Sequence, residues 1–200
     1  MARVPYLAAG DMEAADRQLL DRPINLFRAL AHNPGALRQL SDFGTWIRYH
    51  GCADPRLREL AILAVGLSAE APYEVSHHAK IGLEFGVTPA DLRGIAQVLR
   101  EQGTEHFTEL EVAVLTAARE LTLRGELADA DWQLLSRELG LPAAVELIVV
   151  ISFYNMVVRL LAALAVDTEA AYEQYLTFFP GWPAAPDKQP GSSSDRTESP

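Results

Sequence analysis

Residues 54–92 read DPRLRELAILAVGLSAEAPYEVSHHAKIGLEFGVTPADL, and this stretch decides the fold. A capping side chain followed by proline, as in Asp54-Pro55 and Thr88-Pro89, is typical of a helix start, because the side chain accepts from an unpaired backbone N–H. The pattern predicts helices at 55–69 and 72–85, the second ending before Gly86. The first, like a later helix expected at 142–165, is apolar almost all round, so we expect neighbours to cover every side of both.

Similar start and stop signals recur along the rest of the chain. No stretch alternates apolar and polar residues for long, and no Asn-Gly type hairpin turn is present, so we predict no strand. The sequence therefore predicts an all-α orthogonal bundle, with the hairpin 55–85 as its core and 55–69 and 142–165 at its centre. Further helices are expected at 11–20, 23–31, 35–49, 89–101, 109–124, 129–138, 142–165 and 168–178.

A change in composition near residue 180 divides the chain into a domain and a tail. Residues 1–179 have ordinary globular composition, whereas 180–200 read PGWPAAPDKQPGSSSDRTESP and contain little that can be buried. We expect one helical domain followed by a disordered tail. Phe178, Phe179 and Trp182 at the junction are expected to pack within the chain or, alternatively, against another subunit.

Charge and composition exclude several classes of partner. The formal charge is -10 and the 17 basic residues are scattered, which argues against nucleic acid, because phosphate binding needs clustered Lys and Arg. The apolar run 147–158 is shorter than the roughly 20 residues that cross a bilayer. The first twenty residues lack a continuous apolar segment, and Cys52 is the single cysteine, so no intrachain disulfide forms. We expect a cytoplasmic protein that binds neither nucleic acid nor a membrane.

Three polar residues stand out within the predicted hairpin. Glu74 and His78 are four residues apart, so their side chains share one helix face, and the hairpin would bring Glu59 near them. Carboxylates beside a buried histidine have the pKa shifts that suit proton transfer. The same residues also fit a structural role, because a Glu in a first turn is favoured by the helix dipole and Glu–His pairs often only solvate a surface. Spacing alone leaves both interpretations open.

The segments RLRELAIL and APYEVSHHAKIGLEFGVTPADLRGI resemble the core of the carboxymuconolactone decarboxylase family, part of the alkyl hydroperoxidase D-like superfamily. Arg58 and Glu59 match the first element of the family signature, and His78 matches its histidine, with Ala79 and Gly86 following. The flanking segments agree, so the likeness spans roughly residues 2–175. The resemblance implies the all-α fold of that superfamily and assembly as a homo-oligomer, a dimer, trimer or hexamer.

The sequence departs from the peroxidase branch of this superfamily at the decisive positions. That branch carries a Cys-x-x-Cys pair where this chain has Ala71 and Glu74. A thiol peroxidase needs a thiolate and a resolving thiol, and Cys52 has no partner cysteine. The decarboxylase branch, by resemblance, uses no cofactor and often has a Glu at the position of Glu74. The resemblance therefore implies acid/base roles for Glu59, Glu74 and His78.

We predict a cofactor-free lyase or isomerase that acts on a small acidic or lactone-like metabolite. Candidate substrate-binding residues near the three acid/base groups are His77, Tyr73 and Arg58. No metal is expected, because adjacent helical residues such as His77 and His78 point about 100° apart and no HExxH spacing is present. The alternatives are a non-catalytic binding or assembly protein of the same fold and, against the residues, a thiol peroxidase.

Overall fold

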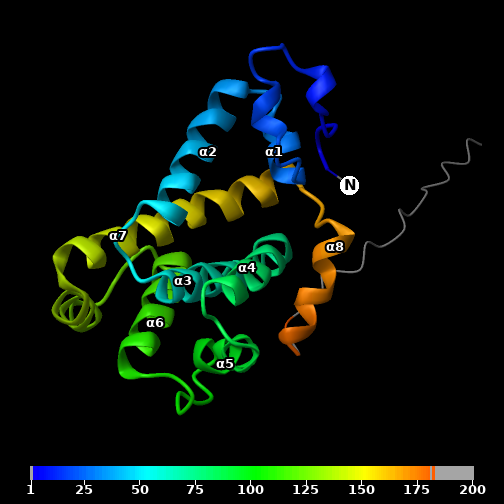
Figure 1. Ribbon diagram of the computed structural model, residues 1–200. Coiled ribbons are helices and arrows are strands. Elements are labelled where there is room, and N and C mark those ends of the chain that lie inside the picture. Colours follow the sequence, from blue (N-terminus) through cyan, green and yellow to red (C-terminus); the bar gives the residue numbers. More distant parts are fainter. Residues whose placement is uncertain (1, 181, 183–200) are drawn as a thin grey trace, which may run out of the picture.

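The computed structural model describes residues 2–180 and 182, and within them the chain is helical with no strand. The predicted all-α class is confirmed (Figure 1). Short 3-10 helices, labelled η, occur near both ends of the described chain. The elements are η1 Ala9–Asp11, η2 Arg17–Leu20, α1 Asn25–Leu30, α2 Pro34–Tyr49, α3 Pro55–Ser68, α4 Pro72–Glu84, α5 Pro89–Leu99, α6 Glu109–Leu123, α7 Asp129–Leu164, α8 Ala170–Glu173 and η3 Gln174–Phe178.

Helix α3 forms the centre of the bundle, as its composition predicts. Every residue from Arg58 to Leu67 is buried, and α3 contacts α4, α5, α6 and α7 (Figure 1). Its start is fixed by Asp54, whose side chain accepts a hydrogen bond of 3.0 Å from Leu57 N, with Pro55 following in the first turn. A helix with no exposed face has to be surrounded, and this requirement sets the position of the four helices around it.

Helix α7 consists of two helical segments joined at Gly140. That glycine has φ 74°, a left-handed conformation that costs glycine little, and Pro142 follows it. The break agrees with the predicted helices at 129–138 and 142–165. The expectation that neighbours cover the second segment on all sides is wrong, because Leu141, Val145 and Met156 are exposed along one face.

The apolar part of α7 is also longer than the run 147–158 suggests. By length and composition α7 is long and apolar enough to cross a membrane, and it is the one helix among the described residues that meets this test. The core helix of a soluble protein passes the same test, and half of the most apolar window of α7 is buried inside the molecule. The packing of α7 against α3 and α6 is consistent with a soluble protein.

Two predicted helices near the chain ends are shorter than expected. In place of a helix at 11–20, the chain forms η1 and η2, which bury Met12 and Leu20 against Leu37. In place of a helix at 168–178, it forms the four-residue α8 followed by η3. Helix nucleation is unfavourable, so short segments depend on what they can pack against, and here 3-10 turns make the packing contacts.

The aromatic cluster at the end of the domain packs within the chain. Phe179 is buried, and the indole N–H of Trp182 donates a hydrogen bond of 3.2 Å to the backbone carbonyl of Leu67 at the end of α3. Intrachain packing is therefore confirmed for these two residues. Apart from Pro180 and Trp182, the predicted tail 180–200 lies outside the described residues.

Candidate functional site

The hairpin of α3 and α4 brings Glu59 and His78 into direct contact. Nδ1 of His78 lies 2.7 Å from Oε2 of Glu59, and both residues are buried. The two helices approach closely at Gly66, where an added Cβ would lie 3.0 Å from Cγ2 of Val75. Because glycine removes that obstacle, the first turn of α4 can sit directly against α3.

Glu74 completes the arrangement from the opposite side of the imidazole. Nε2 of His78 lies 3.0 Å from Oε1 of Glu74, one helical turn earlier on α4. Glu74 is itself buried and lies in the first turn of α4, where the helix dipole favours an anion. The structure thus brings the three predicted acid/base residues together, with the imidazole between two carboxylates.

The electrostatics of this trio favour its charged form. Burial lowers the pKa of His78, but the charges of Glu59 and Glu74 and their hydrogen bonds raise it by more, so the net shift is upward. Burial raises the pKa of Glu59, yet His78, Arg58 and Arg48 lower it further, and the net shift is downward. Both shifts favour an ion pair between a protonated His78 imidazole and an ionised Glu59.

Arg58 lies behind the trio instead of facing a ligand. Its Nε donates to Oε1 of Glu59 at 3.2 Å, and its Nη1 donates to the backbone carbonyls of Ile47 and Arg48 at the end of α2. The guanidinium also stacks over the ring of Phe85, at 4.9 Å from its centroid. Arg58, predicted to bind substrate, instead connects Glu59 to the last turn of α2.

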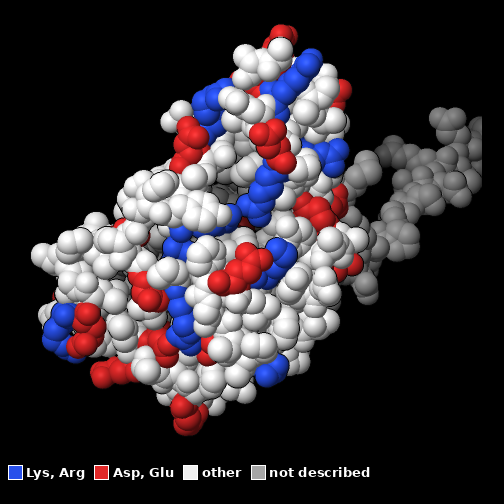
Figure 2. Space-filling view, viewed as in Figure 1, with Lys and Arg blue, Asp and Glu red and all other residues white. Residues whose placement is uncertain are grey.

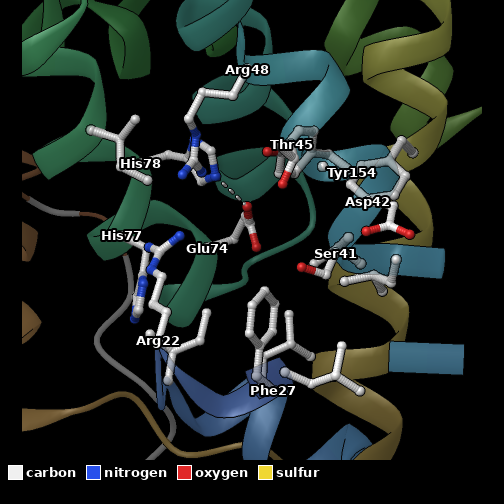
Figure 3. A pocket seen from close by; sticks show the side chains of 18 of the residues that line it. Arg22, Phe27, Ser41, Asp42, Thr45, Arg48, Glu74, His77, His78 and Tyr154 are labelled. Atoms are coloured by element: carbon white, nitrogen blue, oxygen red, sulfur yellow. Dashed lines mark ion pairs between the residues drawn. The ribbon is translucent and has the colours of Figure 1, made fainter. Parts of the chain in front are cut away.

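A pocket of about 510 Å³ opens in front of His78 and Glu74 (Figure 3). Glu74 and His78 line it, whereas Glu59 stands behind the imidazole and does not. Its volume suits a small organic molecule. The walls come mainly from α1, α2, α4 and α7, and Figure 2 shows a hollow between α1 and α2 on the outer surface. The polar lining residues besides the trio include Arg22, Ser41, Asp42, Thr45, Arg48, Tyr73, His77 and Tyr154.

His77 and Tyr73 also line the pocket, and both are held by the C-terminal segment. The His77 ring is stacked between Tyr73 and Tyr172, with centroids at 4.2 Å and 3.7 Å. Its Nε2 lies 2.7 Å from Oε2 of Glu169, and the Tyr73 hydroxyl lies 3.3 Å from Oε1 of the same carboxylate. The structure therefore anchors these two predicted binding residues to Glu169. Their role toward a ligand stays a prediction.

Arg48 and Tyr154 both line the pocket, and neither was among the site residues predicted from the sequence. The Tyr154 ring meets the His78 imidazole edge-on, with centroids 4.8 Å apart. Arg48 extends from the last turn of α2 toward the side of the pocket that holds His78 (Figure 3). The signal for Tyr154 was a polar residue inside an apolar helix. Arg48 gave none, because an arginine near a helix C-terminus is common.

Cys52 lies apart from the pocket lining and is exposed. Its backbone N–H and that of Ala53 donate to the carboxylate of Glu146, at 2.6 Å and 3.0 Å. A hydrogen bond to Glu146, together with the charge of that carboxylate, raises the pKa of the thiol. Within the described residues, no group of three or more His, Cys, Asp or Glu side chains is arranged to hold a metal ion.

Comparison with protein-family models gives a match to the carboxymuconolactone decarboxylase family over residues 34–120, which contains α2 to most of α6 and so both helices of the site. Over residues 34–120 the chain is therefore similar to the carboxymuconolactone decarboxylase family. A search of the curated proteins finds no match. The resemblance carried by Arg58, Glu59 and His78 is thereby confirmed.

Solved structures confirm the predicted alkyl hydroperoxidase D-like fold. An uncharacterized peroxidase-related protein from Ralstonia eutropha JMP134, described as an alkylhydroperoxidase AhpD core, matches with a TM-score of 0.72 at 19% identity, covering 86% of this chain and 94% of that one. A cysteine-to-alanine variant of the debrominase Bmp8, in complex with 2,3,4-tribromopyrrole, matches with a TM-score of 0.70 at 20% identity, covering 88% and 98%. At such identities the likeness concerns the fold.

Proposed function

We propose that this protein is a cofactor-free acid/base enzyme, a lyase or isomerase, acting on a small acidic or lactone-like molecule. The observation that carries the proposal is the imidazole of His78, held between the carboxylates of Glu59 and Glu74 at the wall of a pocket. Three buried ionisable groups that contact one another are expensive to maintain for stability alone, since desolvation offsets most of the attraction between them. Their position at a cavity supports a chemical role.

Glu74 is the group through which the trio reaches a bound molecule. It lines the pocket beside His78, whereas Glu59 contacts Nδ1 of His78 and is not part of the pocket lining. When the Glu74 carboxylate takes a proton from substrate carbon, the electron pair of the C–H bond stays on the substrate as an enolate, whose charge the neighbouring imidazolium stabilises. In the reverse direction, protonated Glu74 returns the proton to carbon and becomes a carboxylate again, while Glu59 keeps the His78 ring protonated. Glu59 is thus a positioning residue.

Both reaction types need little beyond this arrangement. In decarboxylation, the carbon–carboxylate bond breaks, its electrons move into the adjacent carbonyl or lactone, and the resulting enolate takes a proton from the site. In isomerisation, a carbon adjacent to a carbonyl loses a proton to Glu74 and a conjugated carbon receives one. Exclusion of water by the buried walls strengthens the electrostatic part of either step.

Thiol peroxidase chemistry finds no support at this site. Ala71 and Glu74 occupy the positions of the cysteine pair, and Cys52 is outside the pocket lining with a raised pKa. A less acidic thiol forms less of the thiolate that attacks peroxide. Activity toward peroxide that survives Cys52→Ser would therefore not be thiol chemistry.

Hydrogen exchange at carbon tests the proposal without knowledge of the physiological substrate. Acetoacetate and 5-oxotetrahydrofuran-3-carboxylate, a 3-oxo acid and a lactone acid, are incubated with the protein in D2O and followed by NMR for deuterium incorporation and for loss of CO2. We expect catalysed exchange or decarboxylation with the native protein, reduced about 100-fold or more in Glu74→Gln and His78→Gln. His106→Gln, outside the pocket lining, is the matched control. Equal rates in all four proteins would refute acid/base catalysis at this site.

Assembly as a homo-oligomer is a separate proposal, supported by an exposed apolar face on α2 and α7. The residues concerned are large and apolar, yet more than a third of each is exposed. They are Phe43, Trp46 and Tyr49 on α2 and Leu141, Val145 and Met156 on α7. Exposed apolar surface of this kind is typical of subunit contacts, and a second copy of the chain is the partner that we propose. The same face supports the second candidate function, a non-catalytic assembly protein.

Light scattering coupled to gel filtration tests the oligomer. Trp46→Glu and Met156→Glu each place a charge on the face and should shift the protein to monomers, whereas Leu123→Glu, at an exposed position at the end of α6, should leave the mass of the assembly unchanged. A native protein that is monomeric at all concentrations would contradict the proposal. A dimer, trimer or hexamer are all consistent with it, and a cytoplasmic location remains a prediction from sequence.

A further inference from the structure

Arg48 and Tyr154 offer polar groups to the pocket that no neighbouring acid uses. No ion pair joins Arg48 to a carboxylate in the part of the chain that the structure describes, although Arg48 is only partly exposed. The Tyr154 hydroxyl likewise makes no hydrogen bond to another described residue, and the residue is buried. The Arg48 guanidinium lies over the ring of Tyr49, 5.9 Å from its centroid, a contact that does not neutralise its charge. A bound anion would give Arg48 and Tyr154 a shared hydrogen-bond partner.

The two groups act on the same region of the pocket. Burial raises the pKa of the Tyr154 hydroxyl, as do Glu74 and Glu59, while the positive charges of Arg48 and Arg58 oppose that rise. The hydroxyl therefore stays protonated and can donate. Burial lowers the pKa of the Arg48 guanidinium, but nearby groups that include Glu59 raise it by more. The Tyr154 ring meets the His78 imidazole with centroids 4.8 Å apart, and the Arg48 side chain extends to the same side of the pocket (Figure 3).

Several other walls of the pocket are apolar. Leu26 and Phe27 come from α1, Ile81 from α4, and Phe153 and Val157 from α7, and all line the pocket. Such surfaces favour the hydrophobic part of a ligand by roughly 25 cal/mol for each Å² of apolar area removed from water. A fully polar ligand, such as a sugar or a phosphate ester, would leave these walls unmatched.

We infer that the pocket binds an amphipathic monocarboxylic acid, whose carboxylate accepts hydrogen bonds from Arg48 and Tyr154 and whose apolar body lies against Phe27, Ile81 and Phe153. This inference rests on the site of the proposed function and narrows its substrate class. A guanidinium suits a planar carboxylate, which it can bind through two parallel hydrogen bonds.

A second negative charge on the ligand would be unfavourable. The pocket already contains the carboxylate of Glu74, and Asp21 and Asp42 stand at its exposed rim. Arg38 is paired with Asp16 at 2.6 Å, which leaves Arg22, at the exposed rim, as the other lining arginine without an ion pair to a described residue. The balance of charge therefore favours one carboxylate, bound at Arg48, over a dianion.

A pair of isosteric ligands tests the inference by binding alone. Calorimetry at neutral pH with trans-cinnamate and with the uncharged trans-cinnamamide gives the preference of the pocket for a carboxylate. We expect the native protein to prefer the acid by about tenfold or more, the range of a charge-assisted hydrogen bond. Arg48→Gln should abolish that preference, and Tyr154→Phe should reduce it several-fold. Arg22→Gln, the rim control, should leave most of it.

Several outcomes would overturn the inference. The first is that the native protein binds cinnamate no more tightly than cinnamamide. The second is that the Arg48→Gln variant keeps the preference for cinnamate while circular dichroism shows that it is folded. Tighter binding of succinate than of cinnamate would show that the pocket prefers a dianion to a monocarboxylate. Because no turnover is measured, failure of the exchange experiment with intact cinnamate binding refutes only the proposed reaction, and the reverse result refutes only this ligand class.

Discussion

Two clusters in this molecule contain the same residue types and use them differently. In the pocket cluster, defined as Arg58, Glu59, Glu74 and His78, the carboxylates receive hydrogen bonds from side chains. In the surface cluster, defined as Arg56, Asp91, His106 and Glu111, each carboxylate also accepts from a backbone N–H at a helix start. A histidine contacts a buried carboxylate in both.

The difference separates a structural use from a chemical one. Asp91 and Glu111 close the capping boxes of α5 and α6, and Arg56 joins the two carboxylates, so their hydrogen-bonding capacity is consumed by holding helix ends. Glu59 and Glu74 cap nothing. Buried carboxylates that bind only a histidine and an arginine retain lone pairs for a proton or a ligand, and this contrast supports placing the chemistry in the pocket cluster.

Removing the histidine from each cluster should give the largest difference. His78→Ala leaves two carboxylates buried without a cation between them, and we expect it to lower the free energy of unfolding by about 3 to 5 kcal/mol. His106→Ala removes a side chain that is 43% exposed, and a partly exposed pair of this kind contributes about 0.5 kcal/mol. Urea denaturation of both variants measures the contrast. Equal losses would mean that burial does not distinguish the clusters.

Replacing the arginine of each cluster by lysine should give a smaller contrast. Arg58 binds Glu59 and two carbonyls of α2 with separate nitrogens, which a single ammonium cannot reproduce, so Arg58→Lys should cost about 2 kcal/mol. Arg56→Lys keeps one ion pair on a partly exposed side chain and should cost about 0.5 kcal/mol or less.

The shift in the urea denaturation midpoint measures the loss of stability in both lysine variants. A functional readout separates positioning from stability, because Arg58→Lys also loosens Glu59 behind the imidazole. The exchange rate at carbon should therefore fall in Arg58→Lys and stay unchanged in Arg56→Lys. A folded Arg58→Lys protein with the native rate would contradict a positioning role for Arg58.

The pocket cluster was predictable because its geometry is local. Glu74 and His78 are one turn apart on one helix, and Glu59 lies on the helix that precedes it in the same hairpin. Helical periodicity, together with Asp54-Pro55 at the start, is enough to bring three such groups together. The same local signals predicted α2 to α6 and the break at Gly140.

The parts that escaped prediction depend on contacts between distant segments. Glu169 reaches His77 and Tyr73 only because the chain after α7 returns to α4. Arg48 enters the pocket because the end of α2 is tied to Arg58 through its backbone carbonyl. The segment 11–20 has helical composition but packs as 3-10 turns on α1 and α2. None of these partners is visible in a local pattern.

The pH dependence of stability gives the smallest effect and isolates the charged state of the pocket cluster. The folded pKa of His78 is raised, so its stabilising contribution is complete below the unfolded value near 6.5 and is lost as the pH rises through the folded pKa. The folded pKa of Glu59 is lowered, so its contribution is complete above about 4.5 and is lost as the pH falls through the folded pKa. The stability difference between the native protein and His78→Gln should therefore be greatest between these two values and decline on both sides. Urea titrations across that range measure it, and a difference that stays constant with pH would show that the imidazole is held uncharged between the two acids.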